Sequence, residues 1–323
     1  MPWNERLGRR IKLNGLRVLQ STIAVGSMAG AARDLGMTQP AVSYAIGEME
    51  RALGVPLLDR TPQGVLPTPY GEALARRSTA VFNELRQGIE DIAFLADPGG
   101  GEIRIGATPP MSLIAAAAIN RLIERYPRMT FHLIVEPTDV LLRQLGSRSL
   151  ELAISRMIDP ATPDWIESEV LFHDRLSIIA GKRNPWARRR RPIELHQLMG
   201  GPWALPPPEG FLSPLIRSAF AARGLPAPQA TVTTQSTYTL ATLASEGPFL
   251  IIHPETMLRV PVAHPDLAAL PVVLEGARNP IELLRLKDRA ISPVAAVFAQ
   301  AVRDVVRAAG LARTPRPRRT ASP

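Results

Sequence analysis

Two short helical patterns, separated by a break around Gly36, constrain the N-terminal fold of this chain most strongly. Ser27 can cap a helix over residues 28–35, and the glycine at 36 suits the position that ends it. Thr38 can cap a second helix, and Pro40 falls in its first turn, where the missing N–H costs nothing. Two capped helices joined by so short a break are typical of a helix-turn-helix.

The second helix separates into an apolar and a polar face. Val42, Ile46, Met49 and Leu53 recur at steps of four, three and four residues, which predicts a buried face. The opposite face is the candidate DNA-reading surface, because amides and hydroxyls can bond base edges and helix N-termini attract phosphates. The predicted DNA-binding residues here are Ser27, Thr38, Gln39, Pro40, Ser43, Tyr44 and Arg51. The alternative is an ordinary exposed face of a small helical domain.

Residues 57–68 predict a hairpin beside these helices. Two short extended runs flank a turn at Gln63 and Gly64, as in the wing of a winged helix-turn-helix. Arg60 lies where it can meet a phosphate, and we include it among the predicted DNA-binding residues.

Residues 11–70 resemble the DNA-binding domain of LysR-type transcriptional regulators. The matching residues are Gly26-Ser27-Met28, Ala31-Ala32, Leu35 to Ser43, Ile46, Glu50, Leu53 to Leu57, Arg60, Gly64 to Pro69 and Gly71. Three features depart from the family pattern: Tyr44, the helix-loosening Gly47, and a wing without basic residues at Gln63, Leu66 and Pro67. We therefore expect a DNA preference that differs from that of relatives.

A long helix is predicted over residues 69–96, where Thr68 and Pro69 provide a cap and a first turn. Its apolar and small positions form a heptad seam of Leu74, Ser78, Val81, Leu85, Gly88, Ile92 and Leu95. The seam predicts a dimer, with packing on the helix's own domain as the alternative. Gly99 to Gly101 then predict a hinge.

After residue 101, predicted strands alternate with helices, which indicates a parallel sheet with helices on its faces. The resemblance implies two α/β subdomains folded like a periplasmic binding protein. The predicted fold is therefore α+β multidomain, with a winged helix-turn-helix, a long linker helix and a two-subdomain α/β regulatory region. The expected divisions are residues 1–68, 69–98, 101–168 with 268–310 (subdomain I), 169–267 (subdomain II) and a disordered tail at 311–323.

Four residues at predicted strand ends are candidates for binding an effector: Thr108, Thr138, Arg156 and Ser236. Ligands in such folds lie at strand C-termini and helix N-termini, and the resemblance implies effector contacts at these positions. The alternative for the Thr and Ser positions is helix capping alone. Arg156 suits a carboxylate, and residues 203–208 resemble a segment of a subgroup responsive to sugars and aromatic acids. The expected effector is an organic acid or a sugar-derived compound.

Composition excludes several classes of protein. There is no cysteine, so disulfides and thiolate metal sites are absent. The net charge of +9 is weak support for DNA binding, because Arg188 to Arg191 and four arginines in residues 313–319 account for nearly all of it. Both clusters are interpreted as a solvated loop and tail.

No catalytic motif is present, neither a zinc H-E-x-x-H, a G-x-S-x-G, a P-loop nor a dinucleotide fingerprint, so an enzyme is not expected. Neither a cofactor nor a metal is predicted. The first residues carry no apolar run and no stretch is long enough for a bilayer, so a cytoplasmic protein without membrane contact is expected. The expected partners are double-stranded DNA, a small-molecule effector, further copies forming a homodimer and then a homotetramer, and RNA polymerase. The alternative is a cytoplasmic small-molecule binding protein without DNA activity.

Overall fold

The computed structural model describes residues 10–62, 64–97, 99–156, 163–210, 212–260, 265–274 and 278–311. Two compact units divide the chain. Unit 1 comprises the residues up to Ile89 together with Gly146–Ser149, and unit 2 comprises the remainder. The predicted disordered tail at residues 311–323 lies almost wholly outside the described residues.

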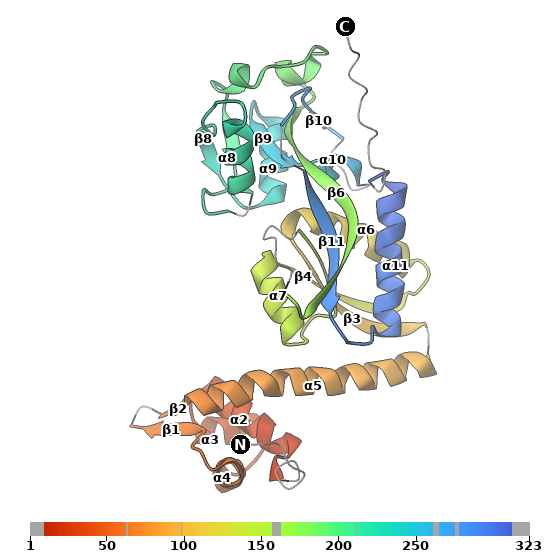
Figure 1. Cartoon of the computed structure of the whole chain (residues 1–323). Helices are drawn as coiled ribbons and strands as arrows, with labels where there is room; N and C mark the ends of the chain where they lie inside the picture. Colours follow the sequence, from red (N-terminus) through yellow and green to blue (C-terminus); the bar gives the residue numbers. More distant parts are fainter. Residues whose placement is uncertain are drawn as a thin grey trace. The chain divides into compact units, whose positions relative to one another are not determined.

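Unit 1 is a helix-turn-helix followed by a hairpin, as predicted (Figure 1). Its elements are α2 (Leu13–Val25), α3 (Met28–Asp34), α4 (Gln39–Leu53), β1 (Leu58–Thr61), β2 (Gly64–Pro67) and the first part of α5 (Pro69–Ala96). The core gathers one face of each helix, including Leu19 from α2, Ala31 from α3, and Ile46 and Met49 from α4. Burial of these faces fixes which side of α4 remains exposed.

Two glycines allow the hairpin to sit close to the helices. Gly64 has φ +139°, and a Cβ there would lie 2.5 Å from the carbonyl oxygen of Gly26. The same carbonyl accepts a hydrogen bond from Val65 N at 2.8 Å. A Cβ on Gly71 would lie 2.0 Å from the carbonyl oxygen of Leu57, so only glycine fits there.

Unit 2 is built on one continuous sheet with the strand order β4-β3-β5-β11-β6-β9-β7-β8, and β10 pairs with β6. The strands are β3 (Gly100–Ala107), β4 (Arg128–Val135), β5 (Leu152–Ser155), β6 (Ile166–Gly181), β7 (Trp203–Leu205), β8 (Ala230–Thr233), β9 (Leu250–Pro254), β10 (Leu267–Ala269) and β11 (Arg278–Leu286). Strands β3, β4 and β5 are parallel, whereas β11 is antiparallel to β5 and β6. The sheet is therefore mixed rather than wholly parallel.

Helices cover both faces of the sheet in each half of unit 2. The helices are α6 (Ser112–Ile123), α7 (Thr138–Gly146), α8 (Ser213–Ala221), α9 (Thr237–Glu246), α10 (Thr256–Arg259) and α11 (Pro293–Ala308), with 3₁₀ turns η1 (Pro109–Met111), η2 (Pro185–Arg188) and η3 (Leu195–Leu198). In the first half, α6 and α11 share one core and α7 lies over another. In the second half, α8 and α9 belong to two further cores. Strands β6 and β11 run between the halves (Figure 1).

Some elements were not expected from the sequence. Strand β6 runs from Ile166 to Gly181, and its first part has no apolar pattern that predicts a strand. Its first residues are mostly polar and exposed, because they pair with β11 near the surface of the first half. Strands β7 and β10 are only three residues long, too short to show a period. In the described part of the chain, no helix is long and apolar enough to cross a bilayer.

Candidate functional site

Helix α4 presents the predicted DNA-reading face. Gln39 and Pro40 are exposed at its N-terminus, and Tyr44 is 65% exposed one turn later. Thr38 caps this helix, since its Oγ1 accepts a hydrogen bond from Ala41 N at 3.4 Å. Ser27 caps α3 in the same way, through Gly30 N at 3.0 Å. Both residues therefore cap helices of the motif, and their predicted contacts with DNA would come in addition to this role.

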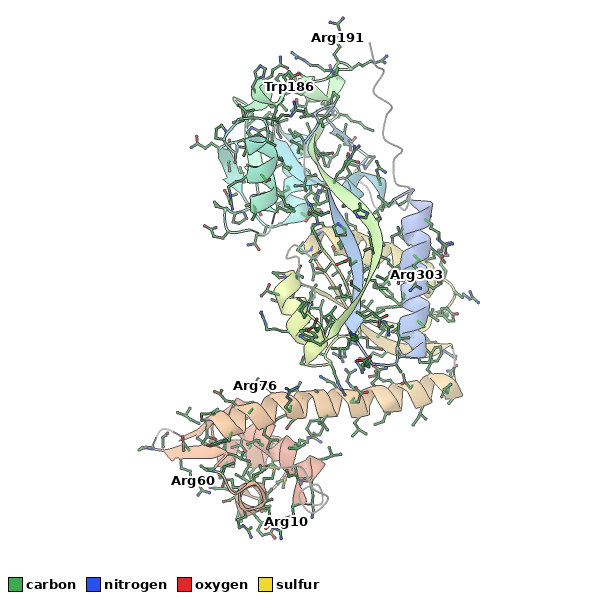
Figure 2. The ribbon with its side chains drawn as sticks, viewed as in Figure 1. Arg10, Arg60, Arg76, Trp186, Arg191 and Arg303 are labelled. Atoms are coloured by element: carbon green, nitrogen blue, oxygen red, sulfur yellow. The ribbon has the colours of Figure 1, made fainter. Side chains whose placement is uncertain are left out.

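The hairpin brings Arg60 to the same face. Its Nη2 donates to the Ser43 hydroxyl at 3.3 Å, joining β1 to the middle of α4, and Figure 2 shows Arg60 at the hairpin. Glu50 holds the approach to the hairpin, because its Oε1 accepts from Leu57 N at 2.8 Å and Leu58 N at 3.3 Å. In the sequence, Glu50 was noted only as one of the residues that match the LysR-type pattern.

Arg51 is engaged within its own helix. It forms an ion pair with Glu48 at 2.6 Å and donates from Nε to the Gly47 carbonyl at 3.1 Å. Its guanidinium also lies 5.9 Å from the ring centroid of Tyr44. The predicted DNA contact of Arg51 would therefore exchange these exposed contacts for a phosphate.

A cavity of about 350 Å³ opens in unit 2 at the carboxyl ends of several strands. It is lined by Thr108, Pro109, Pro110, Pro137, Thr138, Asp139, Pro206, Glu209, Gly210, Leu212, Thr234, Gln235, Thr237, Leu240 and His253. These residues come from both halves of the sheet. Helices α7 and α9 begin at this cavity, and N–H groups in the first turn of a helix lack intrahelical partners.

Two predicted effector residues line the cavity directly. Thr108 is almost fully buried at the end of β3. Thr138 shares a 2.8 Å hydrogen bond with Ser155 and donates to the Arg156 carbonyl at 3.3 Å. Ser236 is not among the lining residues; its hydroxyl caps α9 by accepting from Thr239 N at 3.2 Å. Its neighbours Gln235 and Thr237 reach the cavity instead.

Arg156 lies in the interior rather than in the lining of the cavity. It is only 1% exposed. Burial lowers the pKa of its guanidinium, and the charge of Asp174 opposes that effect. The Arg156 carbonyl contacts Thr138, but the Arg156 side chain is buried and is not among the residues that line the cavity, whereas the other three predicted residues lie in or beside its wall.

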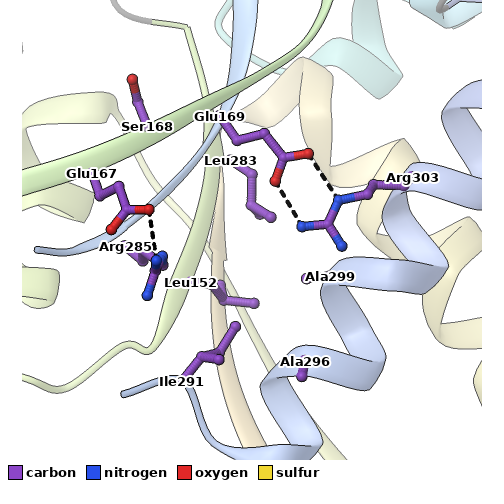
Figure 3. Close-up of a pocket in the computed structure, with 10 residues that line it drawn as sticks. All are labelled: Leu152, Glu167, Ser168, Glu169, Leu283, Arg285, Ile291, Ala296, Ala299 and Arg303. Atoms are coloured by element: carbon purple, nitrogen blue, oxygen red, sulfur yellow. Dashed lines mark hydrogen bonds and ion pairs between the residues drawn. The ribbon is translucent and has the colours of Figure 1, made fainter. Parts of the chain in front are cut away.

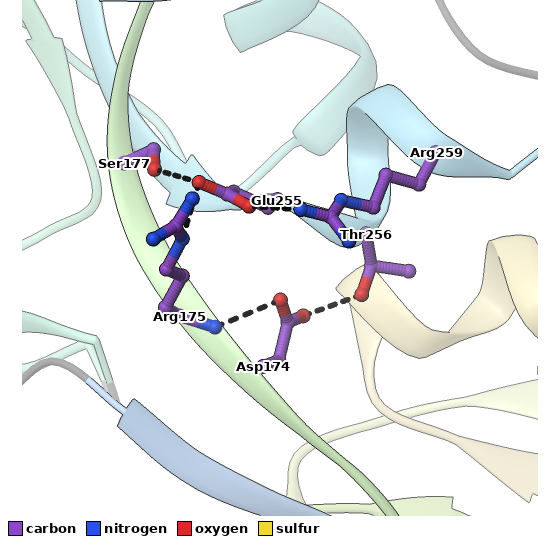
Figure 4. A network of polar contacts seen from close by, with 6 residues as sticks. All are labelled: Asp174, Arg175, Ser177, Glu255, Thr256 and Arg259. Carbon is purple, nitrogen blue, oxygen red and sulfur yellow. Dashed lines mark hydrogen bonds and ion pairs between the residues drawn. The ribbon is translucent and has the colours of Figure 1, made fainter. Parts of the chain in front are cut away.

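A polar network near Asp174 joins β6 to the end of β9 and to α10 (Figure 4). Asp174 accepts from Arg175 N at 2.9 Å and from the Thr256 hydroxyl at 2.5 Å. Burial raises the pKa of Asp174, while the Thr256 hydrogen bond and the charge of Arg156 lower it. Glu255 is also buried. It accepts from Arg175 Nε and Ser177 Oγ, both at 2.6 Å, and from Arg259 at 3.0 Å.

A second cavity, of about 290 Å³, lies between β6, β11 and α11 (Figure 3). Its walls carry two ion pairs, Glu169 with Arg303 at 2.7 Å and Glu167 with Arg285 at 2.6 Å. Arg303 binds both oxygens of Glu169. These charges satisfy one another, and the hydrogen bond from Arg303 holds the pKa of Glu169 below its ordinary value.

Two family models match the chain. Residues 13–72 match the bacterial regulatory helix-turn-helix protein model of the LysR family, and residues 78–307 match the LysR substrate binding domain. The first match decides against the alternative of a binding protein that lacks a DNA-binding domain.

Named relatives and solved structures are similar to this chain over most of its length. The HTH-type transcriptional regulator GbpR of Rhizobium radiobacter is 30% identical over 227 residues, covering 69% of this chain and 75% of that protein. The HTH-type transcriptional regulator PcaQ of Agrobacterium fabrum is 27% identical over 300 residues, covering 92% and 95%. The crystal structure of full-length CbnR complexed with its target DNA superimposes with a TM-score of 0.64 at 19% identity, covering 91% of this chain and 99% of CbnR. Full-length BenM gives a TM-score of 0.54, also at 19% identity, covering 94% and 100%. The chain belongs to the LysR family of transcriptional regulators and combines a helix-turn-helix DNA-binding domain with a substrate-binding domain for a small-molecule effector.

Proposed function

We propose that this regulator reads DNA through α4 and grips the backbone through the hairpin. The exposed Gln39 and Tyr44 and the half-buried Ser43 form the base-reading surface, since α4 buries its opposite face. Arg60 acts as the phosphate contact, and the observation that supports this is its 3.3 Å hydrogen bond to Ser43, which holds it beside the reading face.

A pair of variants separates these two roles. Binding is measured by fluorescence anisotropy on the duplex upstream of the chain's own gene and on a scrambled duplex, over a range of salt concentrations. Gln39→Ala is expected to weaken binding to the cognate duplex by about 10-fold or more, with little change on the scrambled one. Arg60→Ala is expected to weaken both and to reduce the salt slope by about 1. Equal effects of the two variants on both duplexes would contradict this division.

The proposed effector is a small organic acid, in particular a hydroxylated, sugar-derived acid, bound in the 350 Å³ cavity. The observation that supports this proposal is the lining of the cavity, which contains threonine hydroxyls and the N-termini of α7 and α9. Both kinds of group favour an anion. The described lining contains neither Lys nor Arg; of its two acids, Asp139 is paired with Arg143 at 2.8 Å and Glu209 is exposed to solvent. Hydroxyls and helix N-termini would therefore hold the carboxylate, and Thr108 and Thr138 would bond it directly.

Thermal shift of the full chain against matched pairs of sugar acids and neutral sugars tests this proposal. Acids are expected to raise the melting temperature as their concentration passes Kd. Thr138→Val is expected to weaken the affinity for an acid hit by about 10-fold, because a hydrogen bond to a charged group contributes about 1.5 kcal/mol or more. Thr242→Val, an exposed change on α9, serves as the control. Stabilisation by neutral sugars alone would overturn the choice of an acid.

We further propose that α5 joins two copies. Its first part packs on unit 1, where Leu74 and Phe82 contact the core and Ser78 is buried. Beyond Ser78 the seam is uncovered, since Leu85 is 48% and Ile92 68% exposed. An exposed apolar stripe along one helix suits a second copy of the same helix. Pairs of dimers would form the tetramer, with RNA polymerase as a partner on DNA.

The proposed domain division keeps residues 1–68 as the DNA-binding domain and 69–98 as the linker. Residues 101–168 with 268–310 form subdomain I, and 169–267 form subdomain II. Separate cores on either side of the β6 and β11 crossover support two subdomains, although Leu270 packs in a core of the second half and Val260 in a core of the first. Because the relatives carry regulator names, the proposed activity is regulatory, without catalysis of its own.

A further inference from the structure

A dense group of cations follows the end of β6. Six of the ten residues from 182 to 191 are basic: Lys182, Arg183, Arg188, Arg189, Arg190 and Arg191. All six side chains are exposed. Figure 2 shows Arg191 at the end of unit 2, beyond Trp186. We call these six residues the basic face.

The backbone beneath the basic face is fixed at both ends. Asn184 is buried; its Oδ1 accepts from Trp186 N at 3.0 Å and its Nδ2 donates to the Pro248 carbonyl at 3.1 Å. Arg189 N donates to the Trp186 carbonyl at 3.2 Å. Ile193, just after the run, is buried and donates from its N to the Pro271 carbonyl at 3.0 Å. The segment is therefore anchored and not a free loop, so its charges cost less entropy to order on binding.

The apolar side chains of this segment turn inward. Trp186 and Ala187 pack against the core that contains Trp203 and Phe220. The Arg189 guanidinium lies 4.3 Å from the ring centroid of Trp186 and shields the ring. Between and beside the cations, the exposed apolar residues are the two prolines, Pro185 and Pro192, so the outward surface is mainly cationic. A protein interface usually has a larger apolar centre than these two prolines provide.

The cations are not neutralised by the rest of the described chain. None of the six forms an ion pair with a carboxylate in the ranges that the structure describes, although Glu194 and Asp266 are exposed nearby. The other exposed arginines of unit 2 include many that are paired, such as Arg303 with Glu169 and Arg143 with Asp139. The basic face thus carries an uncompensated local charge.

We propose that the basic face binds the phosphate backbone of double-stranded DNA, without sequence preference and in addition to the contacts of the helix-turn-helix. The DNA duplex carries about one negative charge per 1.7 Å of its axis, and the arginine fork matches phosphate oxygens in a bidentate manner. This second contact lengthens the footprint of a protein that already binds DNA and makes its affinity more dependent on salt.

The test uses the full chain and a long duplex of random sequence, with Kd measured over a range of salt concentrations. The face variant replaces Arg183, Arg188, Arg190 and Arg191 with Ser. The slope of log Kobs against log salt is expected to become less negative by about 2 to 4, because each phosphate contact contributes about 0.9. Low-salt affinity is expected to fall by about 10-fold or more. Arg→Lys replacement at the same four positions is expected to retain most of the slope.

The matched control replaces four other arginines, Arg313, Arg316, Arg318 and Arg319, with Ser and removes the same charge. It is expected to keep the wild-type slope, and both variants should keep the wild-type melting temperature. An unchanged slope in the face variant, or an equal loss in the control, overturns the proposal. Loss of binding to polyglutamate with unchanged DNA binding also overturns it, and assigns the face to an acidic protein. Gln39→Ala should leave this slope intact, so failure here is distinct from failure of the proposed base reading.

Discussion

Replacing Glu151 with Gln should make the protein more stable at alkaline pH and leave its stability unchanged at acidic pH. Burial raises the pKa of the Glu151 carboxyl from its ordinary 4.5 to about 7. The Ser292 hydroxyl and Arg289 lower it, whereas the charges of Glu90 and Asp91 raise it further. The carboxylate is therefore penalised in the folded state.

The sign follows from proton binding. Between pH 4.5 and 7 the folded state holds the Glu151 proton more tightly than the unfolded chain does. The stability from the protonated carboxyl is complete below pH 4.5 and is lost as the pH rises through 7. At 1.36 kcal/mol per pH unit, the full loss is about 3 kcal/mol, an upper bound because the side chain is partly exposed to solvent.

Chemical denaturation of the wild type and Glu151→Gln between pH 4 and 8.5 measures the effect. Because glutamine is neutral throughout, the variant should gain about 1 to 3 kcal/mol over the wild type at pH 8.5. The two free energies of unfolding should converge as the pH falls below 4.5. A variant that is less stable than the wild type at pH 8.5, or a difference that does not change with pH, would refute the reasoning.

Four further variants have expected outcomes of different sign. Glu169→Gln should destabilise by about 0.5 kcal/mol at pH 7, since its exposed pair with Arg303 is screened. The loss should shrink as the pH falls through the lowered pKa of Glu169, and a series of denaturation curves from pH 7 down to the lowest pH at which the protein stays folded checks this. Gly71→Ala should lower the free energy of unfolding by about 2 kcal/mol or more, because its Cβ meets the Leu57 carbonyl. Gly47→Ala has open space around its Cβ and should raise the free energy of unfolding by about 0.5–1 kcal/mol in the same denaturation experiments. Replacing Leu85 and Ile92 together with Asp should yield monomers in sedimentation velocity, and intact dimers would exclude the seam as the interface.

Local sequence signals were enough for the N-terminal motif. Ser27 and Thr38 were expected to cap helices, and they do so because a side-chain oxygen needs only the N–H three residues ahead. The apolar period likewise identified the buried face of α4, because Val42, Ile46 and Met49 all face the core. The Arg60–Ser43 contact spans 17 residues, and only the hairpin register determines it.

Long-range packing decided the rest of the site. Arg156 was expected at a ligand cleft because it ends a strand. The sequence of one strand, however, does not encode where that strand lies in the order of the sheet. Strand β5 lies between β3 and β11, deep in the sheet, and this position leaves Arg156 buried. His253 and Gln235 of the cavity wall lie beside predicted strands yet carried no spacing signal.

The crossover strands indicate where an effector could act on the rest of unit 2. The first part of β6, Ile166–Val170, pairs with β11 in the half that contains α11. Its last part, from Leu176 on, pairs with β9 and β10 in the other half. Between these parts, β11 has a register irregularity between Ile281 and Glu282.

The cavity takes its wall from both halves. A ligand that moves one half relative to the other must therefore bend β6 and β11 along this intervening stretch. The buried network at Asp174 and Glu255 lies at its end and fixes β6 to the second half. Bending should therefore concentrate next to Asp174, at Phe172 and His173, whose partners Ile281 and Pro280 on β11 lie outside the stretch that pairs with β5.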